Sequence, residues 1–292
     1  MPAISTNIAA NSAVRYLNIN SNQETSSLSK LSSGSRITSA SDDAAGLAIS
    51  TRISSDITTL QQAATNAAQA TSILQTADGG ASNISDILAR MKSLASESAS
   101  GTTVGTSRTY IQSEFSQLIS EISSIATGTR YSGQSLLDGT STFSAGVSVL
   151  VGSSATDTID IKLSDLTAST LGVSSLDVST QSGATAALTT LDTAIDTVSK
   201  ARADIGAQES RFNFSADSIS TQTQNLQSAN SAIKDVDIAS EQAKLSSAQV
   251  KTQAAVSAEA AANQIPQYLL KLLTVIRRHP PRERPGRRRA GP

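Results

Sequence analysis

Apolar residues recur at alternating spacings of three and four residues over a long stretch of the chain. Between Leu188 and Ile233, ten of the fourteen positions in this register are apolar. The mean spacing of 3.5 residues is typical of a coiled-coil seam, and a helix of this length extends for roughly 70 Å at about 1.5 Å per residue. The pattern therefore predicts one long helix with an apolar edge that packs against other helices.

Two earlier stretches show the same spacing. The first predicts a helix with its seam over Ile53–Leu94, and the second predicts a shorter helix with its seam over Ile111–Ile125 and with Thr106 and Ser107 as N-caps. Because the three seams share one period, their helices can pack along one another. The sequence therefore predicts a mainly α fold, built as a long antiparallel rod of helices.

The two ends of the chain carry weaker seams made of fewer and smaller apolar residues. Such seams bury little area, and isolated helices owe most of their stability to tertiary packing. We therefore expect the ends to order only when they meet each other or neighbouring copies of the chain. The predicted terminal seam consists of Val14, Leu17, Leu28, Leu31, Val250, Ala254, Ala261, Leu269 and Leu272.

The segment between residues 139 and 183 is different, because it is rich in Gly, Ser and Thr. It contains two runs of alternating apolar and polar residues, Val147–Val151 and Thr158–Leu163, joined by Gly152–Asp157. Alternation on both sides of a polar turn is the pattern of two paired strands. A small β-hairpin at about 145–165 is therefore predicted.

Composition supports long helices over a globular core. The chain has no proline between Pro2 and Pro266, and proline is common in turns but excluded from helix interiors. Aromatic residues make up only 3% of the chain, and there is no Trp. One large spherical core built on aromatic side chains is therefore not expected.

Candidate chemistry is scarce. The absence of Cys excludes disulfides and thiolate sites, His279 is the single histidine, and neither a zinc-protease motif nor a phosphate-binding glycine loop occurs. The adjacent carboxylates Asp42 and Asp43 are interpreted as helix N-terminal caps rather than as a metal or acid–base pair. We therefore predict no catalytic activity and no cofactor or metal.

The N-terminal sequence lacks a signal-peptide pattern, and no apolar stretch is long enough for a transmembrane helix. Stable membrane insertion is therefore not expected. Charge is uneven, since residues 274–292 contain seven basic residues and one acidic residue, against 16 basic and 23 acidic in the rest. This basic tail is predicted to be disordered. It could bind nucleic acid or an anionic surface, but a shifted reading frame near a stop codon is the favoured interpretation, and no nucleic-acid partner is expected.

The segment Leu28–Ile49 resembles the N-terminal signature of bacterial flagellins, LSSGxRIxSAxDDAAGLAI. Three later segments are also similar to flagellin motifs: Tyr131–Gly139, Ile205–Phe212 and Ala262–Gln267. The resemblance extends over residues 1–273. A match of some twenty residues in order is far more specific than a short motif.

This resemblance implies a hairpin-shaped chain with paired termini. Residues 1–43 and 234–273 would form the two halves of an inner coiled coil, and residues 44–233 would form a rod. Larger flagellins carry an outer domain after the position of Gly172, and here only a short link to Gly183 follows. The implied function is that of a filament subunit that polymerises with itself outside the cell, after type III export assisted by a chaperone bound near 234–273 and by the filament cap.

One helical region resembles the part of flagellins that Toll-like receptor 5 recognises. Arg90, Leu94 and Glu114 match the family's contact residues, whereas Ala89, Lys92 and Ser93 differ from its usual residues. The favoured alternative is a helix face that only packs on neighbouring subunits. Two other functions stay open from the sequence, namely a hook–filament junction protein and a flagellin-like cell-surface binding protein.

Overall fold

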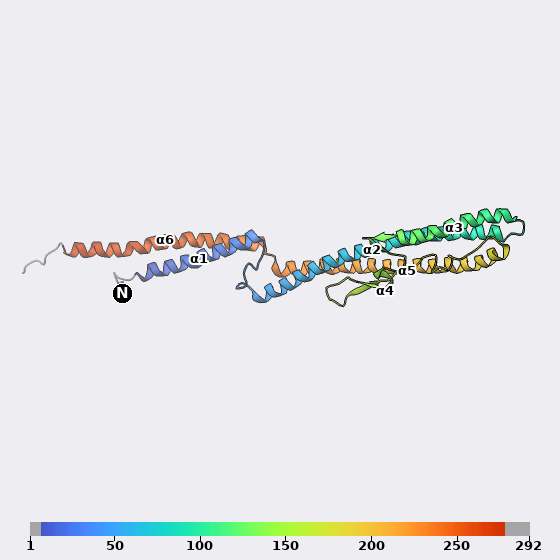
Figure 1. The fold of residues 1–292 in the computed structure, drawn as a ribbon. Helices are drawn as coiled ribbons and strands as arrows, with labels where there is room; N and C mark the ends of the chain where they lie inside the picture. Colours follow the sequence, from blue (N-terminus) through green and yellow to red (C-terminus); the bar gives the residue numbers. More distant parts are fainter. Residues whose placement is uncertain (1–6, 278–292) are drawn as a thin grey trace, which may run out of the picture. The chain divides into compact units, whose positions relative to one another are not determined.

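The computed structural model describes residues 7–277, which divide into two compact units. Among the described residues, unit 1 combines 7–50 with 230–277, and unit 2 comprises 51–229. The predicted domain limits, 43/44 and 233/234, differ from these divisions by a few residues and stay a prediction. The helices shown in Figure 1 are α1 (Ile8–Ser33), α2 (Ala44–Ala99), α3 (Gly105–Gly128), α4 (Thr142–Ala145), α5 (Gln181–Lys234) and α6 (Ile238–Arg277).

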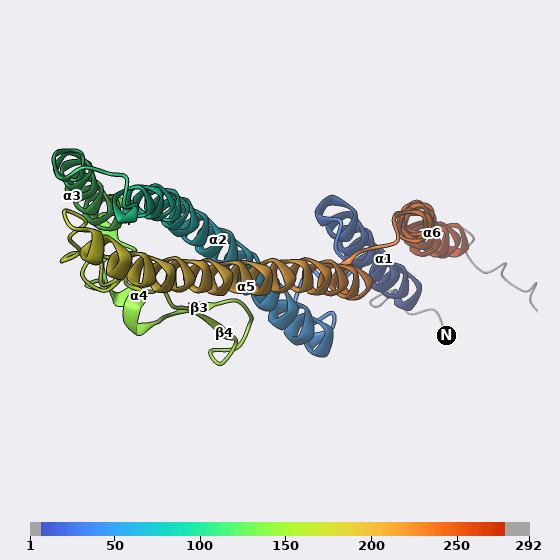
Figure 2. The same cartoon turned by 90° about the vertical axis from the view of Figure 1, so that its right-hand side faces the viewer.

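Three long helices form the body of unit 2, where α2, α3 and α5 run side by side (Figures 1 and 2). All seam positions predicted for α5, and all those predicted for α2, are buried or half-buried. Ion pairs join the helices, with Arg90 and Lys92 of α2 contacting Glu114 of α3 and Asp192 of α5. The predicted antiparallel packing of long helices is thereby confirmed.

Helix α2 carries a second buried row that the sequence analysis missed. A helix packed between two others must bury a wider face than a single coiled-coil seam provides. The prediction followed a single heptad register and therefore left this row out, although it includes two leucines. The additional buried positions are Ala63, Ala70, Leu74, Ala81, Leu88 and Ala95.

The predicted N-caps of α3 are wrong. The helix begins at Gly105, and its N-cap is Val104, which makes no side-chain capping bond. The start of α3 is instead tied down by Arg108, whose guanidinium donates to the carbonyls of Ser98 and Ser100 at 2.9 Å each. Both carbonyls lie at the end of α2, so Arg108 joins the two helices across their turn.

The predicted β-hairpin is confirmed. Strands β3 (Val147–Leu150) and β4 (Thr158–Ile161) pair antiparallel, with Val147 opposite Ile161 and Leu150 opposite Thr158. Two hydrogen bonds tie the hairpin region to the helices: Asn66 of α2 donates to the Leu150 carbonyl, and the Lys162 amide donates to Gln208 of α5.

A second, smaller hairpin was not predicted. It pairs β1 (Arg130–Tyr131) with β2 (Gln134–Ser135). Its two turn residues, Ser132 and Gly133, have φ of 50° and 84°, and two consecutive positive φ values suit the twist of a tight hairpin. The strands are too short for an alternating pattern to reveal them.

In unit 1, α1 and α6 lie against each other and run antiparallel (Figure 1). The predicted pairing of the two ends of the chain is therefore confirmed. Helix α6 continues to Arg277, so the first four residues of the predicted basic tail are helical rather than disordered, and residues 278–292 lie outside the described part of the chain.

Candidate functional site

The contact between α1 and α6, called the terminal seam below, follows a heptad repeat in both helices. Its positions alternate at spacings of three and four residues, and each is buried or half-buried. Small side chains dominate, which lets the two backbones run close together. The terminal seam consists of Ala10, Ala13, Leu17, Asn20, Glu24, Ser27 and Leu31 of α1, and of Glu241, Leu245, Ala248, Thr252, Ala255, Glu259 and Ala262 of α6.

The predicted terminal seam is only partly correct. Leu17 and Leu31 lie on it, half-buried, but most of the other predicted positions are exposed. On α6 the predicted positions lie one or two residues away from the buried alanines, Ala248, Ala255 and Ala262. The exposed positions are Val14, Leu28, Val250, Ala254 and Ala261, and Leu269 and Leu272 lie in a part of α6 whose side chains are not described.

Glu241 is a charged residue buried within the terminal seam, with only 5% of its surface exposed. Ser27 Oγ of α1 donates to Glu241 Oε1 at 2.7 Å, and Lys244 Nζ donates to Oε2 at 2.9 Å. The hydrogen bond from Ser27, followed by that from Lys244, holds the pKa of Glu241 below its usual value. The carboxylate is therefore kept ionised at the α1–α6 contact.

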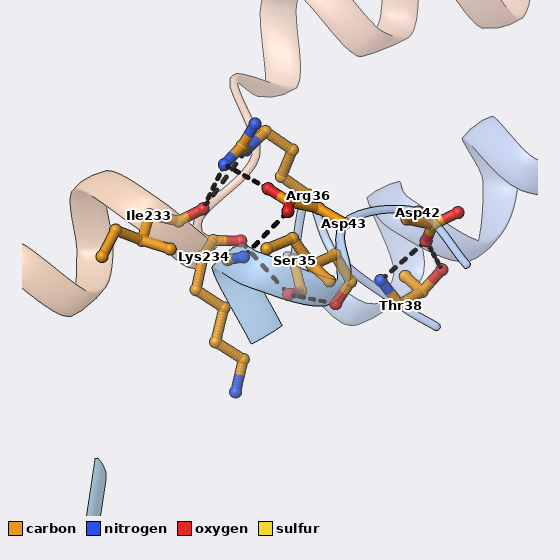
Figure 3. Close-up of polar contacts among 9 residues, drawn as sticks. Ser35, Arg36, Thr38, Asp42, Asp43, Ile233 and Lys234 are labelled. Atoms are coloured by element: carbon orange, nitrogen blue, oxygen red, sulfur yellow. Dashed lines mark hydrogen bonds and ion pairs between the residues drawn. The ribbon is translucent and has the colours of Figure 1, made fainter. Parts of the chain in front are cut away.

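Just beyond this contact, the chain between α1 and α2 is bonded to the chain between α5 and α6 (Figure 3). The Arg36 amide donates to the Lys234 carbonyl at 2.6 Å, and the Val236 amide donates to the Gly34 carbonyl at 3.1 Å. Ser35 Oγ also lies 3.2 Å from the Lys234 carbonyl oxygen. We call these bonded residues, 34–36 with 233–236, the linker clasp.

Arg36 closes the linker clasp with its side chain. Its Nε and Nη2 both donate to the Ile233 carbonyl, at 3.2 and 2.8 Å, and Nη2 lies 3.9 Å from Asp43 Oδ2 (Figure 3). A guanidinium can offer two N–H groups to one acceptor, which a lysine ammonium cannot do in the same planar geometry. This paired donation explains why an arginine suits position 36 of the flagellin-like N-terminal signature.

The interpretation as a helix N-terminal cap is confirmed for Asp43 but not for Asp42, which bonds to the preceding loop. Asp43 Oδ1 accepts from the Gly46 amide at 2.8 Å in the first turn of α2. Asp42 Oδ2 accepts from the Thr38 amide and hydroxyl and from the Ser39 amide, and the bond from the Thr38 amide is the main cause of its lowered pKa. Both carboxylates thus shape the loop that leads into α2.

Large apolar side chains are exposed mainly in unit 1. Of the fourteen exposed ones among the described residues, eleven lie in this unit, and most of these lie on α1 and α6. Exposed large apolar side chains that gather on one part of a protein favour an interaction surface there. The eleven are Ile8, Val14, Tyr16, Ile19, Leu28, Ile49, Ile238, Val250, Val256, Tyr268 and Leu270.

The residues predicted to contact an innate receptor lie in unit 2. Arg90 and Glu114 are exposed and paired with each other, with Arg90 Nη2 2.7 Å from Glu114 Oε1. Leu94 is only 3% exposed and belongs to the helical core. Because the α2 seam buries this side chain, Leu94 is corrected from a surface contact to a core residue.

Within residues 7–277, no group of three or more His, Asp or Glu side chains is placed to hold a metal ion. Over the same residues, no helix is both long and apolar enough to cross a membrane. The main features of unit 1 are its two paired helices, the linker clasp at one end of them, and the exposed apolar side chains.

Two family models match the chain. The model of the bacterial flagellin N-terminal helical region matches residues 4–142, and that of the bacterial flagellin C-terminal helical region matches residues 188–273. The first match contains the linker 34–43 and the second contains its partner segment 233–236. Together the matches include both sides of the linker clasp.

Two flagellar proteins are similar to almost the whole chain. A flagellin of Halalkalibacterium halodurans is 36% identical over 272 residues, which cover 92% of this chain and 99% of that protein. The flagellar filament 30.7 kDa core protein of Treponema maltophilum is 35% identical over 285 residues, covering 93% and 99%. The crystal structure of Bacillus cereus flagellin is 31% identical, covers 57% of this chain and 94% of that chain, and has a TM-score of 0.49.

Between the two matched helical regions, which end at residue 142 and begin at residue 188, this chain has only its small β region. The chain belongs to the bacterial flagellin family, in a short form without a variable domain.

Proposed function

We propose that this flagellin is a structural subunit of a flagellar filament and that it polymerises with itself through unit 1. The observation that carries the proposal is the concentration of exposed large apolar side chains on α1 and α6. Leaving such surface in water is unfavourable by about 25 cal/mol per Å². Packing against neighbouring copies would cover it.

The α1–α6 pair is suited to ordering on assembly. Its terminal seam contains mostly small or polar side chains, so pairing within one subunit buries little apolar area. Contacts between subunits would supply the missing burial. Val14, Leu28 and Val250 face outward, so we assign these predicted assembly residues to contacts between subunits, rather than to the seam within one.

Export and location follow from the same role. A filament lies outside the cell, and weakly paired terminal helices would suit passage through a narrow export channel as an unfolded chain. We propose that an export chaperone covers the exposed apolar side chains of α6 between residues 234 and 273 before assembly, and that the filament cap folds the subunit at the tip.

Recognition by an innate receptor is a weaker proposal. Arg90 and Glu114 offer a charged surface on unit 2, but Leu94 is buried and Lys92 pairs with Asp192. Packing on neighbouring subunits accounts for this face equally well. The described residues show no feature that favours the hook–filament junction or surface-binding alternative over the filament role.

Seeded polymerisation of the purified protein tests the proposed function. The full-length chain and a chain cut after Leu273 are each added to flagellin seeds and examined by electron microscopy. We expect filaments from the cut chain, and filaments from both if the residues after 273 are harmless. Failure of both chains, under conditions in which an authentic flagellin elongates, would contradict the filament role.

A further inference from the structure

The small side chains of the terminal seam distinguish poorly between alternative pairings of α1 and α6. Ala248, Ala255 and Ala262 are all buried and follow each other at intervals of seven residues. If α6 slid along α1 by one heptad, about 10 Å, most of the α1 positions that face one of these alanines would face another of them. The apolar contacts of these positions would change little, because their energy follows the buried apolar area.

Glu241 interrupts this repeat. It occupies the heptad position before Ala248, and it is the only charged residue among the buried ones that the structure describes. A buried carboxylate is costly unless its oxygens accept hydrogen bonds. In the observed pairing, Ser27 of α1 and Lys244 of α6 bind its two oxygens.

Ser27 meets Glu241 in one register only. Sliding α6 by a heptad in one direction would place Glu241 at the level of Gly34, beyond the end of α1, and would bring Ala248 to Ser27. The opposite slide would place Glu241 at the level of Asn20, whose side-chain amide can also donate, but it would leave the buried Ser27 opposite Lys234, which precedes the start of α6. The other cross-helix bond, from Asn7 Nδ2 to the Ala262 carbonyl at 2.8 Å, selects less, because every residue offers a carbonyl.

We propose that Ser27 and Glu241 are positioning residues that set the register in which α1 and α6 pair. Single polar residues in coiled-coil seams are known to specify register at some cost in stability. The linker clasp brings the two helices together at one end, and the Ser27–Glu241 bond is the first selective contact beyond it.

The register matters for assembly, and this consequence rests on the proposed function. Both helices expose apolar side chains away from the seam, among them Val14 and Ile19 on α1 and Val250 and Val256 on α6. A one-heptad slide would keep the seam but would move the α6 row by about 10 Å along α1. Only one register therefore presents the composite surface that a neighbouring subunit meets.

The natural absence of cysteine allows a direct test by disulfide cross-linking. Ala13 and Ala255 each lie fourteen residues from the Ser27–Glu241 pair, on opposite helices, so cysteines at these two sites report the observed register. Ala13→Cys with Ala248→Cys, or with Ala262→Cys, reports the two shifted registers. The three pairs are compared in the full chain as monomer, under thiol exchange, before any seeding.

With Ser27 and Glu241 intact, the disulfide of the observed register should dominate. Glu241→Leu should raise the fraction of shifted disulfides about tenfold, while the thermal stability of the helix pair is kept or increased, because a hydrophobic residue replaces a buried ion. In Glu241→Gln the disulfide of the observed register should still dominate, since the glutamine amide oxygen can accept from Ser27. Ser27→Ala removes the same bond from the α1 side, so it should also raise the fraction of shifted disulfides.

Glu259→Leu is the matched control. Glu259 is half-buried in the same seam, and the described residues provide no hydrogen-bond or ion-pair partner for it, so this change should leave the register unaltered. An unchanged disulfide ratio in Glu241→Leu and Ser27→Ala would overturn the proposal and leave the linker clasp as the sole determinant. Equal loss of all three disulfides would also overturn it, since the pair would then act on stability alone. Neither outcome bears on seeded polymerisation of the unaltered chain.

Discussion

At the scale of single residues, Arg36 does more than carry a charge. Its guanidinium donates twice to the Ile233 carbonyl and lies near Asp43, so one side chain bonds to α5 and approaches the cap of α2. Lysine at this position would keep the charge but lose the paired donation. The signature motif is therefore explained by hydrogen-bond geometry in the linker clasp.

We expect Arg36→Lys to weaken the linker clasp by about 1 kcal/mol, because a hydrogen bond of this kind contributes roughly that much at a partly exposed site. Amide hydrogen exchange at Arg36 and Val236, whose amides bond across the clasp, measures the effect. Equal protection in the variant and the parent would show that the backbone bonds alone hold the clasp.

Gly46 in the first turn of α2 leaves no space for a side chain. A Cβ atom there would clash with the Asp43 carboxylate and would lie 2.8 Å from Ile37 Cδ1. Gly46→Ala should therefore displace the cap and cost about 1 kcal/mol of helix stability. Gly79→Ala, at a helical glycine with open space around it, should instead stabilise by about 0.5–1 kcal/mol. Thermal unfolding of both variants provides the comparison, and a stabilised Gly46→Ala protein would contradict this account.

The pKa of Glu209, on the α5 seam, is shifted in the opposite direction from that of Glu241. Burial, and secondarily the charge of Asp78, raise the pKa of Glu209, and its Oε1 is buried without a hydrogen-bond partner in the described part of the chain. Because the folded state favours the protonated form, the ionised carboxylate destabilises unit 2 at neutral pH, and this penalty disappears as the pH falls through the raised pKa.

Glu209→Gln should therefore stabilise unit 2 at pH 7. The gain should shrink as the pH approaches the usual pKa of glutamate, about 4.3, because the parent carboxyl is then protonated as well. Denaturant unfolding at several pH values tests this. A gain that does not depend on pH would show that the charge of Glu209 is not the cause.

At the scale of helices and hairpins, the success of sequence reasoning depended on side-chain size. The seams of α2, α3 and α5 contain Ile, Leu and Phe, so their period and face were predicted correctly. The terminal seam contains mostly small or polar residues. Leu17 and Leu31 were placed on it correctly, but the described positions predicted on α6 lie one or two residues away from the buried ones. Burial of a glutamate cannot be anticipated without knowing that Ser27 lies opposite it. The linker clasp was equally hidden, because it is made largely by backbone groups.

The α1–α6 pair should weaken in acid through Glu241. Its pKa is lowered in the folded chain by Ser27 and Lys244, so the stabilisation is complete above the usual glutamate pKa of about 4.3 and is lost as the pH falls through the lower folded value. Circular dichroism during acid titration should show a loss of helix in this range that Glu241→Gln lacks. The same acid transition in both proteins would assign it to other carboxylates.

At the scale of the whole molecule, the buried core and the exposed large apolar side chains are divided between the two units. Unit 2 contains most of the apolar core, including the fully buried Phe115 and Phe212. Unit 1 has a seam of small and polar residues and most of the exposed large apolar side chains. This distribution supports our proposal that unit 2 folds within one subunit, whereas unit 1 is completed by neighbouring subunits.

Hydrogen exchange before and after seeded polymerisation tests this division most directly. The account predicts that amides of α1 and α6 exchange quickly in the monomer and become strongly protected in the filament, while the core amides of α2 and α5 are protected in both states. Terminal helices already fully protected in the monomer, or a gain of protection confined to unit 2, would contradict the claim that the filament is held together through α1 and α6.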